Sequence, residues 1–144
     1  MKDIKIKLVH LITLSTWLHQ LALDKILTRD RTRFLKTIKD ILKGTDYDKK
    51  RLELVKKYAK KDKDGEYIMF EDENGRNNYD LSDEDKEKVK IEYDKVLEQE
   101  LVIPLDGNKS KINAIKEILS TTSFEFQGQY ADEYDEWCEV FEIK

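Results

Sequence analysis

The chain has 144 residues, of which 39% are hydrophobic and 40% charged, and its net charge is −4 at pH 7. This length supports one domain with a real core, so we expect a single domain over residues 1–144, too regularly patterned for a disordered chain. The single cysteine excludes an internal disulfide and a zinc site made of several cysteines, and no apolar run approaches the roughly 18 residues of a membrane span.

The charge is divided unevenly along the chain. Residues 1–63 hold 18 Lys and Arg against 8 Asp and Glu, whereas residues 64–144 hold 9 against 23. We therefore distinguish a basic helical half, 1–63, from a half with a hairpin and acidic helices, 64–144. Two interpretations stay open: the halves fold against each other and neutralise much of the imbalance, or one half carries a surface for a charged partner.

The N-terminal segment begins as a strand and continues as a helix. Residues 3–8 alternate charged and apolar side chains, which predicts a short strand, and the apolar run 101–103 is its candidate partner. From Val9 onwards the apolar period becomes that of a helix. His10 and His19 lie nine residues apart, on opposite sides of this helix, so we expect rim or surface histidines and no shared metal site.

A second helix places an apolar stripe opposite a row of cations. Gly44 is expected to end this helix as a left-handed C-terminal residue. A third helix carries a further row of lysines. The two rows form the candidate basic patch, which consists of Arg29, Arg33, Lys36, Lys43, Lys56 and Lys60. Its functional interpretation is contact with phosphates or an acidic partner, and its structural interpretation is a solvated helix face. No aromatic residue lies among the cations of the second helix, so stacking of single-stranded bases is not favoured there.

The turn after the third helix partly matches a calcium-binding loop. Asp62, Asp64, Gly65 and Glu71 occupy positions 3, 5, 6 and 12 of such a loop. Position 1 is Lys60, whose ammonium group repels a cation. We therefore predict an ordinary turn from helix into strand and no metal site.

Residues 66–81 predict a β-hairpin. Asn74-Gly75 is a strong signal for a two-residue type I′ turn, which needs φ > 0 at both central positions. Counting outward from such a turn places Phe70 opposite Tyr79. We expect this apolar face to pack on helices, because a lone hairpin is only marginally stable in water.

Two more helices follow the hairpin. Ser82 fits the N-cap of a helix, and Asp85 stands three residues further on. This helix is expected to bury Val89, Tyr93, Val96 and Leu97. Pro104 then breaks the chain. A shorter helix carries the apolar residues Ile112, Ile115, Ile118 and Leu119.

The last helix combines an aromatic stripe with many carboxylates. The stripe is expected to be core or interface, and it consists of Tyr130, Tyr134, Trp137, Cys138 and Phe141. Cys138 is interpreted as a small buried hydrophobe without a histidine partner. The other faces form the candidate acidic partner surface, which consists of Asp132, Glu133, Asp135, Glu136 and Glu139. Either these charges stabilise the fold against the basic N-terminal half, or they face a basic partner.

Three segments together resemble a known family. They are RTRFLK (Arg31–Lys36), LVKKYAKKDKDGEYI (Leu54–Ile68) and YDEWCEVFE (Tyr134–Glu142). In order and spacing they are similar to small proteins of unknown function from phages and prophages of Gram-positive bacteria, over nearly the whole chain. The resemblance implies a phage origin, an accessory role and a location in the host cytoplasm. Association with the virion is a further expectation for the location. It implies no catalytic residues.

These observations predict a mostly helical α+β fold with five or six amphipathic helices, the hairpin at about 66–81 and a short N-terminal strand. The expected function is that of a phage accessory protein, not an enzyme, that binds another protein. Its partner would be a phage structural protein, in virion or tail assembly, or a host defence protein that it inhibits. The alternative is nucleic-acid binding through the basic N-terminal half. We expect no cofactor and no membrane contact, and the oligomeric state stays open.

Overall fold

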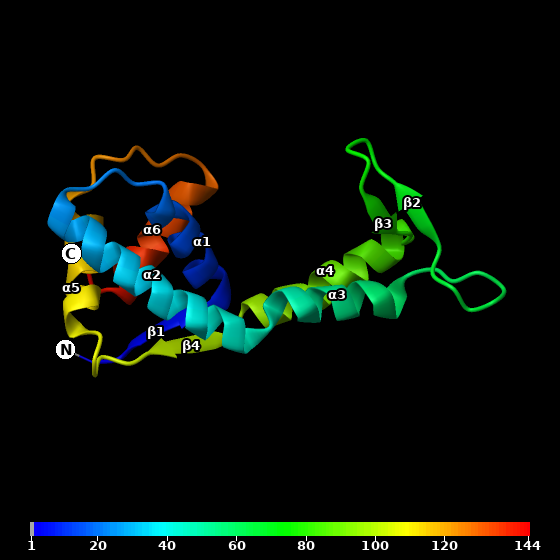
Figure 1. The fold of residues 1–144 in the computed structure, drawn as a ribbon, viewed down its shortest axis with the longest axis horizontal. Helices are drawn as coiled ribbons and strands as arrows, with labels where there is room; N and C mark the ends of the chain where they lie inside the picture. Colours follow the sequence, from blue (N-terminus) through cyan, green and yellow to red (C-terminus); the bar gives the residue numbers. More distant parts are fainter. Residues whose placement is uncertain (1) are drawn as a thin grey trace. The chain divides into compact units, whose positions relative to one another are not determined.

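The computed structural model describes residues 2–144. Over this range the chain forms six helices and four strands, which confirms the predicted mostly helical α+β fold (Figure 1). In chain order the elements are β1 (Ile4–Lys7), α1 (Leu8–His19), α2 (Lys25–Thr45), α3 (Tyr47–Tyr58), β2 (Met69–Glu71), β3 (Asn77–Tyr79), α4 (Asp83–Leu97), β4 (Glu100–Ile103), α5 (Lys109–Thr121) and α6 (Gln129–Val140).

The chain folds into two compact units. Unit 1 comprises Met1–Thr45 and Glu98–Lys144, and unit 2 comprises Asp46–Leu97. The change of charge at residue 63 therefore falls inside unit 2 and coincides with neither boundary. Unit 1 brings the basic N-terminal segment together with the acidic C-terminal segment, so that it holds 14 Lys and Arg against 15 Asp and Glu. The expectation of one domain over the whole chain stays a prediction.

The sheet of unit 1 joins two segments that lie far apart in the sequence. β1 and β4 are antiparallel, with Ile4 opposite Ile103 and Lys7 opposite Glu100. This confirms both the predicted N-terminal strand and its pairing. In each strand alternate residues are buried, because successive side chains of a strand point to opposite faces and only one face meets the helices.

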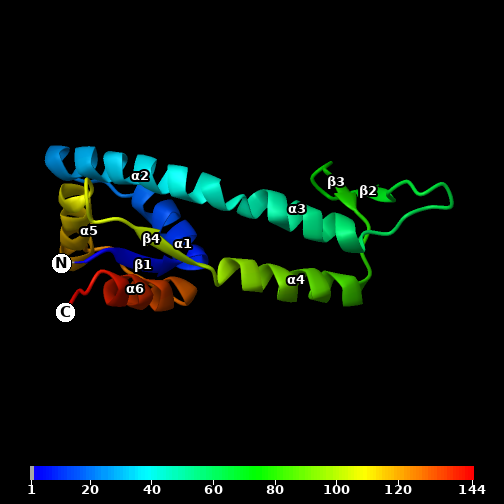
Figure 2. The same ribbon diagram turned by 90° about the horizontal axis from the view of Figure 1, so that it is seen from below.

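α1 lies at the centre of unit 1. It packs against α2 and α6, while α5 packs against α2 (Figure 2). Leu11, Leu14 and Leu18 are completely buried, as the predicted helical period requires. Trp17 is also buried, and its ring stacks on that of Trp137 of α6 at 5.2 Å between centroids. Trp137 and Phe141 of the aromatic stripe are therefore core, as predicted, whereas Tyr130 is 44% exposed and Tyr134 and Cys138 are only half-buried.

The end of α2 differs from the prediction. Gly44 stays within the helix, which continues to Thr45, and Asp46 is the residue in the left-handed region, with φ of 50°. Asp and Asn tolerate this region better than other residues with a side chain. Thr45 also favours the extra residue, because its Oγ1 donates a hydrogen bond to the Leu42 carbonyl oxygen at 2.6 Å.

Unit 2 is built on the pair of helices α3 and α4, which pack against each other. Its interior is small: among the described residues of this unit only Val89 is a buried hydrophobic side chain. Polar contacts join the two helices, since Tyr58 donates a hydrogen bond to the Glu92 carboxylate at 2.9 Å. Ser82 caps α4 as predicted, its Oγ accepting a hydrogen bond from the Asp85 N–H at 3.1 Å.

The hairpin is present, but the predicted register is wrong by one residue. Tyr79 lies opposite Met69, and Phe70 lies opposite Asn78. The Asp72 N–H donates to the Arg76 carbonyl oxygen at 2.9 Å, so that three residues, 73–75, form the loop. Only Gly75 of this loop has a positive φ, whereas a type I′ turn would also need one at the residue before it.

The physical reason for the longer loop is an aspartate at its start. Oδ1 of Asp72 accepts the N–H groups of Asn74 and Arg76, both at 2.9 Å, and this favours a type I turn followed by a left-handed glycine. The preceding turn repeats the arrangement: Oδ1 of Asp62 accepts the N–H groups two and four residues further on, at 2.9 and 3.1 Å. Gly65 and Gly75 have φ values of 80° and 75°.

The hairpin also fails to bury its apolar side chains as predicted. Ile68, Met69 and Phe70 are 39%, 44% and 45% exposed. Tyr79 is half-buried against the ring of Tyr67, at 5.2 Å between centroids. The shift in register explains part of this result, because it moves Phe70 and Tyr79 to opposite faces of the two strands.

Candidate functional surfaces

The candidate basic patch is divided between the two units. Arg29, Arg33, Lys36 and Lys43 lie on α2 in unit 1, and all four are exposed. Lys56 lies on α3 of unit 2, and Lys60 follows that helix and forms an ion pair with Asp80 at 3.7 Å. The six cations therefore belong to two units, and a single patch made of all six stays a prediction.

The part of the patch on α2 is larger than predicted. Helical spacing adds two exposed lysines to the same side, since each lies four residues from a cation already identified. We call the resulting set the cationic face, and Asp40 is its one acidic member. Within residues 2–144 none of the six cations has a carboxylate oxygen within the 4.0 Å of an ion pair. The cationic face consists of Lys25, Arg29, Arg33, Lys36, Lys39 and Lys43.

The candidate acidic surface keeps four of its five members. Asp132, Asp135, Glu136 and Glu139 are exposed and follow one another at i, i+3, i+4 and i+7, so they share one side of α6. We call these four residues the acidic face. Glu133 is only 7% exposed, which corrects its assignment to a partner surface.

Glu133 turns inward because it lies one helical turn before Trp137, on the buried side of α6. Its Oε2 accepts hydrogen bonds from Nδ1 of His10 at 2.7 Å and from Oγ1 of Thr13 at 2.9 Å. On the other side of the ring, Nε2 of His10 is 3.8 Å from Glu136. Trp137 closes the cluster by donating from its indole nitrogen to the His10 carbonyl oxygen at 3.1 Å. The cluster ties α1 to α6.

This cluster was missed in the sequence because its members are far apart. His10 and Glu133 are separated by 123 positions, and no local spacing connects them. The His10 side chain is 17% exposed, which agrees with the expected position at the rim. The single cysteine of the chain, Cys138, does not add a nucleophile. Burial raises the pKa of its thiol, which favours the unreactive thiol over the thiolate.

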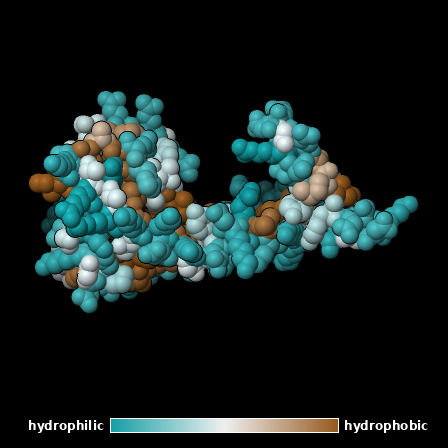
Figure 3. Space-filling model, viewed as in Figure 1, coloured by the Kyte–Doolittle hydropathy of each residue, from teal (hydrophilic) through white to brown (hydrophobic). Residues whose placement is uncertain are grey.

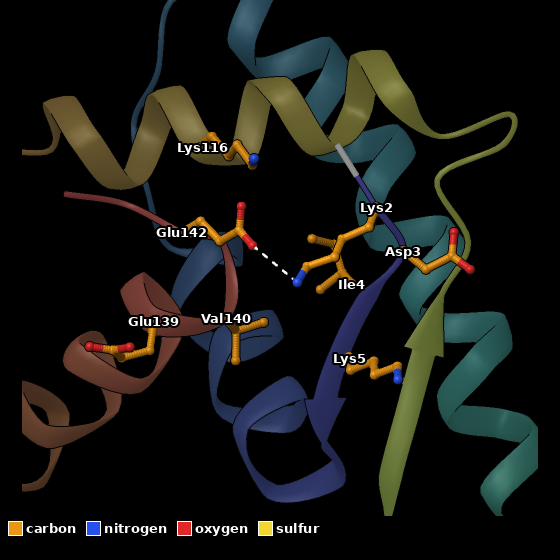
Figure 4. A pocket seen from close by; sticks show the side chains of 8 residues that line it. All are labelled: Lys2, Asp3, Ile4, Lys5, Lys116, Glu139, Val140 and Glu142. Atoms are coloured by element: carbon orange, nitrogen blue, oxygen red, sulfur yellow. Dashed lines mark ion pairs between the residues drawn. The ribbon is translucent and has the colours of Figure 1, made fainter.

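A small polar pocket opens between β1, α5 and α6. It has a volume of about 260 Å³, and charged side chains of both signs line it (Figure 4). Lys2 points towards Glu142, with 3.7 Å between the ammonium nitrogen and the carboxylate oxygen, while Lys116 reaches the pocket from α5. The two signs largely offset each other, so the pocket has no clear preference for an anion or a cation.

The exposed apolar residues of the hairpin lie on both of its faces, because successive side chains of an extended segment point to opposite sides. Ile68, Met69 and Phe70 are consecutive, and we call them the apolar run. Figure 3 shows hydrophobic atoms at the surface of unit 2 near the hairpin. Three acidic residues, Glu71, Asp72 and Glu73, follow the apolar run in succession and lead into the loop.

The carboxylate of Asp72 is committed to the turn. Hydrogen bonds, first from the Arg76 N–H and then from the Asn78 side chain, lower its pKa from the ordinary value. Within residues 2–144 no group of three or more His, Cys, Asp or Glu side chains is arranged to hold a metal ion.

No protein-family model, curated protein or solved structure matches this chain. In the part of the chain that the structure describes, no helix combines the length and the apolar character needed to cross a membrane.

Proposed function

We propose that this chain is an accessory protein of phage origin that acts in the host cytoplasm by binding another protein. The observation that supports this proposal is the apolar run of the hairpin. Phe70 of β2 and Ile68, two residues before it and therefore on the same side of the extended segment, are 45% and 39% exposed, and Met69 is 44% exposed on the other side. The two-stranded sheet that carries them is marginally stable without a cover. Contiguous exposed apolar residues with a polar surround are typical of protein-binding sites.

The surroundings of the apolar run define the kind of partner. Because Glu71, Asp72 and Glu73 follow it directly, the partner should offer an apolar groove with a basic rim. Phe70 would be the central anchor, since aromatic side chains contribute most to binding energy. Virion or tail assembly and inhibition of a host defence protein are the two roles that fit such a partner.

The free energy of burying the apolar run is smaller than the free energy of micromolar binding. Full burial of a large apolar side chain contributes about 1.5–3 kcal/mol, so completing the burial of three half-exposed ones contributes about 3 kcal/mol. Micromolar affinity corresponds to about −8 kcal/mol. Polar contacts of the acidic loop must supply much of the difference, and binding should therefore weaken with salt.

The test is quantitative affinity capture from host cells with an Ile68→Ser, Phe70→Ser variant beside the wild type. We expect the variant to lose at least one protein that wild type retains, with at least tenfold weaker binding once that protein is purified. Leu52→Ser is the matched control, because Leu52 is a 43% exposed apolar residue elsewhere in unit 2. Equal capture by all three proteins would contradict the proposal.

Nucleic-acid binding is the second candidate, and the cationic face of α2 favours it. Six exposed cations on one helix can contact a phosphate backbone, and affinity would then fall steeply with salt. We expect little binding to DNA or RNA at physiological salt, because the chain has a net charge of −4 and its C-terminal segment is acidic. Micromolar binding at that salt, lost when Arg29 and Arg33 become Glu, would reverse the order of the two candidates.

A further inference from the structure

Unit 1 carries two oppositely charged faces on opposite sides. The cationic face of α2 holds six cations and one carboxylate, and the acidic face of α6 holds four carboxylates. Figure 2 shows α2 and α6 on either side of α1 and β1, and α1 packs against both helices. Both faces belong to the same unit, so their separation is fixed by its core.

The two faces are too far apart to neutralise each other within one copy. Packed helices have axes about 8–10 Å apart, so that α1 separates the outer sides of α2 and α6 by roughly 20 Å or more. The Debye length at physiological salt is about 8 Å, and attraction between exposed charges is largely screened beyond it. In the described residues, Asp132, Asp135 and Glu139 have no cation at ion-pair distance. The six cations of the cationic face likewise have no carboxylate at that distance.

We propose that the cationic face of α2 is a docking surface for a second copy of this chain, which presents its acidic face. Charge complementarity selects this occupant. Arg33 and Lys36 lie near the middle of the cationic face, and the acidic face covers about 10 Å of helix against about 27 Å from Lys25 to Lys43. Arginine is well suited to the contact because its guanidinium can bind a carboxylate through two hydrogen bonds.

The contact is heterologous, because two different faces meet. In a dimer one copy therefore keeps its acidic face unused and the other keeps its cationic face unused. Further copies can be added to these faces until a ring closes. Exposed ion pairs are individually weak, so the association requires high protein concentration and weakens with salt. It uses unit 1 and is independent of the partner site proposed for the hairpin in unit 2.

The experiment is sedimentation velocity over a range of protein concentrations, at about 0.05 M and about 0.5 M NaCl. One variant removes two charges from the cationic face (Arg29→Gln, Arg33→Gln), and another removes two charges from the acidic face (Asp135→Asn, Glu139→Gln). The control Lys49→Gln, Lys50→Gln makes the same change of charge at exposed residues of α3 in unit 2. Circular dichroism checks the fold, and Lys36→Gln, Lys43→Gln replaces the arginine variant if that one is unfolded.

Wild type and control should sediment faster with increasing concentration at low salt and as monomers at high salt. Each neutralised variant should stay monomeric by itself. An equimolar mixture of the two variants should form a dimer and no larger species, because only one pair of complementary faces remains.

Three results would overturn the proposal. They are a monomeric wild type at low salt, association of either variant equal to that of wild type, and a mixture that stays monomeric. The cationic face would instead be assigned to a phosphate backbone if wild type bound duplex DNA at physiological salt and the arginine variant did not. This test is separate from that of the hairpin. A Phe70 variant is expected to lose partner capture while its sedimentation stays unchanged.

Discussion

A single carboxylate separates the two interpretations of the acidic helix. Glu133 is buried and accepts two hydrogen bonds from α1, whereas Asp135 is exposed and has no partner at ion-pair distance among residues 2–144. The explanation that the acidic charges stabilise the fold thus applies to Glu133. For the exposed carboxylates a role towards a partner is the better proposal.

Glu133→Gln should destabilise unit 1 by about 1–3 kcal/mol, because it weakens charge-assisted hydrogen bonds from His10 and Thr13 inside the protein. Asp135→Asn is the matched control, with an expected change within about 0.5 kcal/mol. Urea denaturation measures both. Equal midpoints for the two variants would show that the buried cluster contributes nothing specific.

Asp72 makes the hairpin sensitive to acid. Its lowered pKa means that the folded turn favours the ionised carboxylate, so the stabilisation is present above about pH 4 and is lost as pH falls through the folded pKa. Amide shifts of Asn74 and Arg76, followed by NMR from pH 7 to 2, should report this loss. Asp72→Asn should flatten the response, while Asp64→Asn should leave it, because the Asp64 carboxylate accepts no hydrogen bond in the described residues.

At the level of the element, the register of the hairpin is the clearest lesson about prediction from sequence. Asn74-Gly75 correctly marked a turn, but the decisive signal was Asp72, which fits the first position of a type I turn as Gly75 fits the fourth. Asp62 and Gly65 have the same spacing, so the repeat of the pattern was itself readable. What could not be read was the exposure of Phe70, because it depends on where the helices of unit 2 end.

The other elements followed local physical rules. Alternation predicted β1, the pairing with β4 followed from the scarcity of other apolar runs, and Ser82 marked the start of α4. The cationic face was mostly found, because helical spacing is local. The His10–Glu133 pair was not, because it needs the packing of α1 on α6.

Two glycines should respond to alanine with opposite signs. Gly75→Ala should destabilise by about 1–2 kcal/mol, because the site has φ of 75° and the new Cβ would lie 3.3 Å from the Glu71 carboxylate. Gly44→Ala should stabilise by about 0.5–1 kcal/mol, because the site is helical and nothing lies within 4 Å of the new Cβ. Denaturation curves of both variants test the pair, and effects of the same sign would refute it.

At the level of the whole molecule, the core is concentrated in unit 1. All buried hydrophobic residues in the described chain except Val89 belong to it. Few buried apolar contacts mean a low free energy of local opening. Hydrogen exchange followed by mass spectrometry should therefore show faster exchange in α3 and α4 than in α1 and α5. Equal protection in the four helices would show that the two units open together.

The pairing of β1 with β4 also orders events in time. Unit 2 lies within the sequence of unit 1, so a ribosome completes all of unit 2 before it synthesises the strand that β1 requires. Ile4 must then find Ile103 across about a hundred residues, and such distant pairings form slowly. During synthesis β1 therefore has neither its partner strand nor α6, which contacts it in the folded unit, and we expect its apolar side to stay exposed to other chains until residue 140 has emerged.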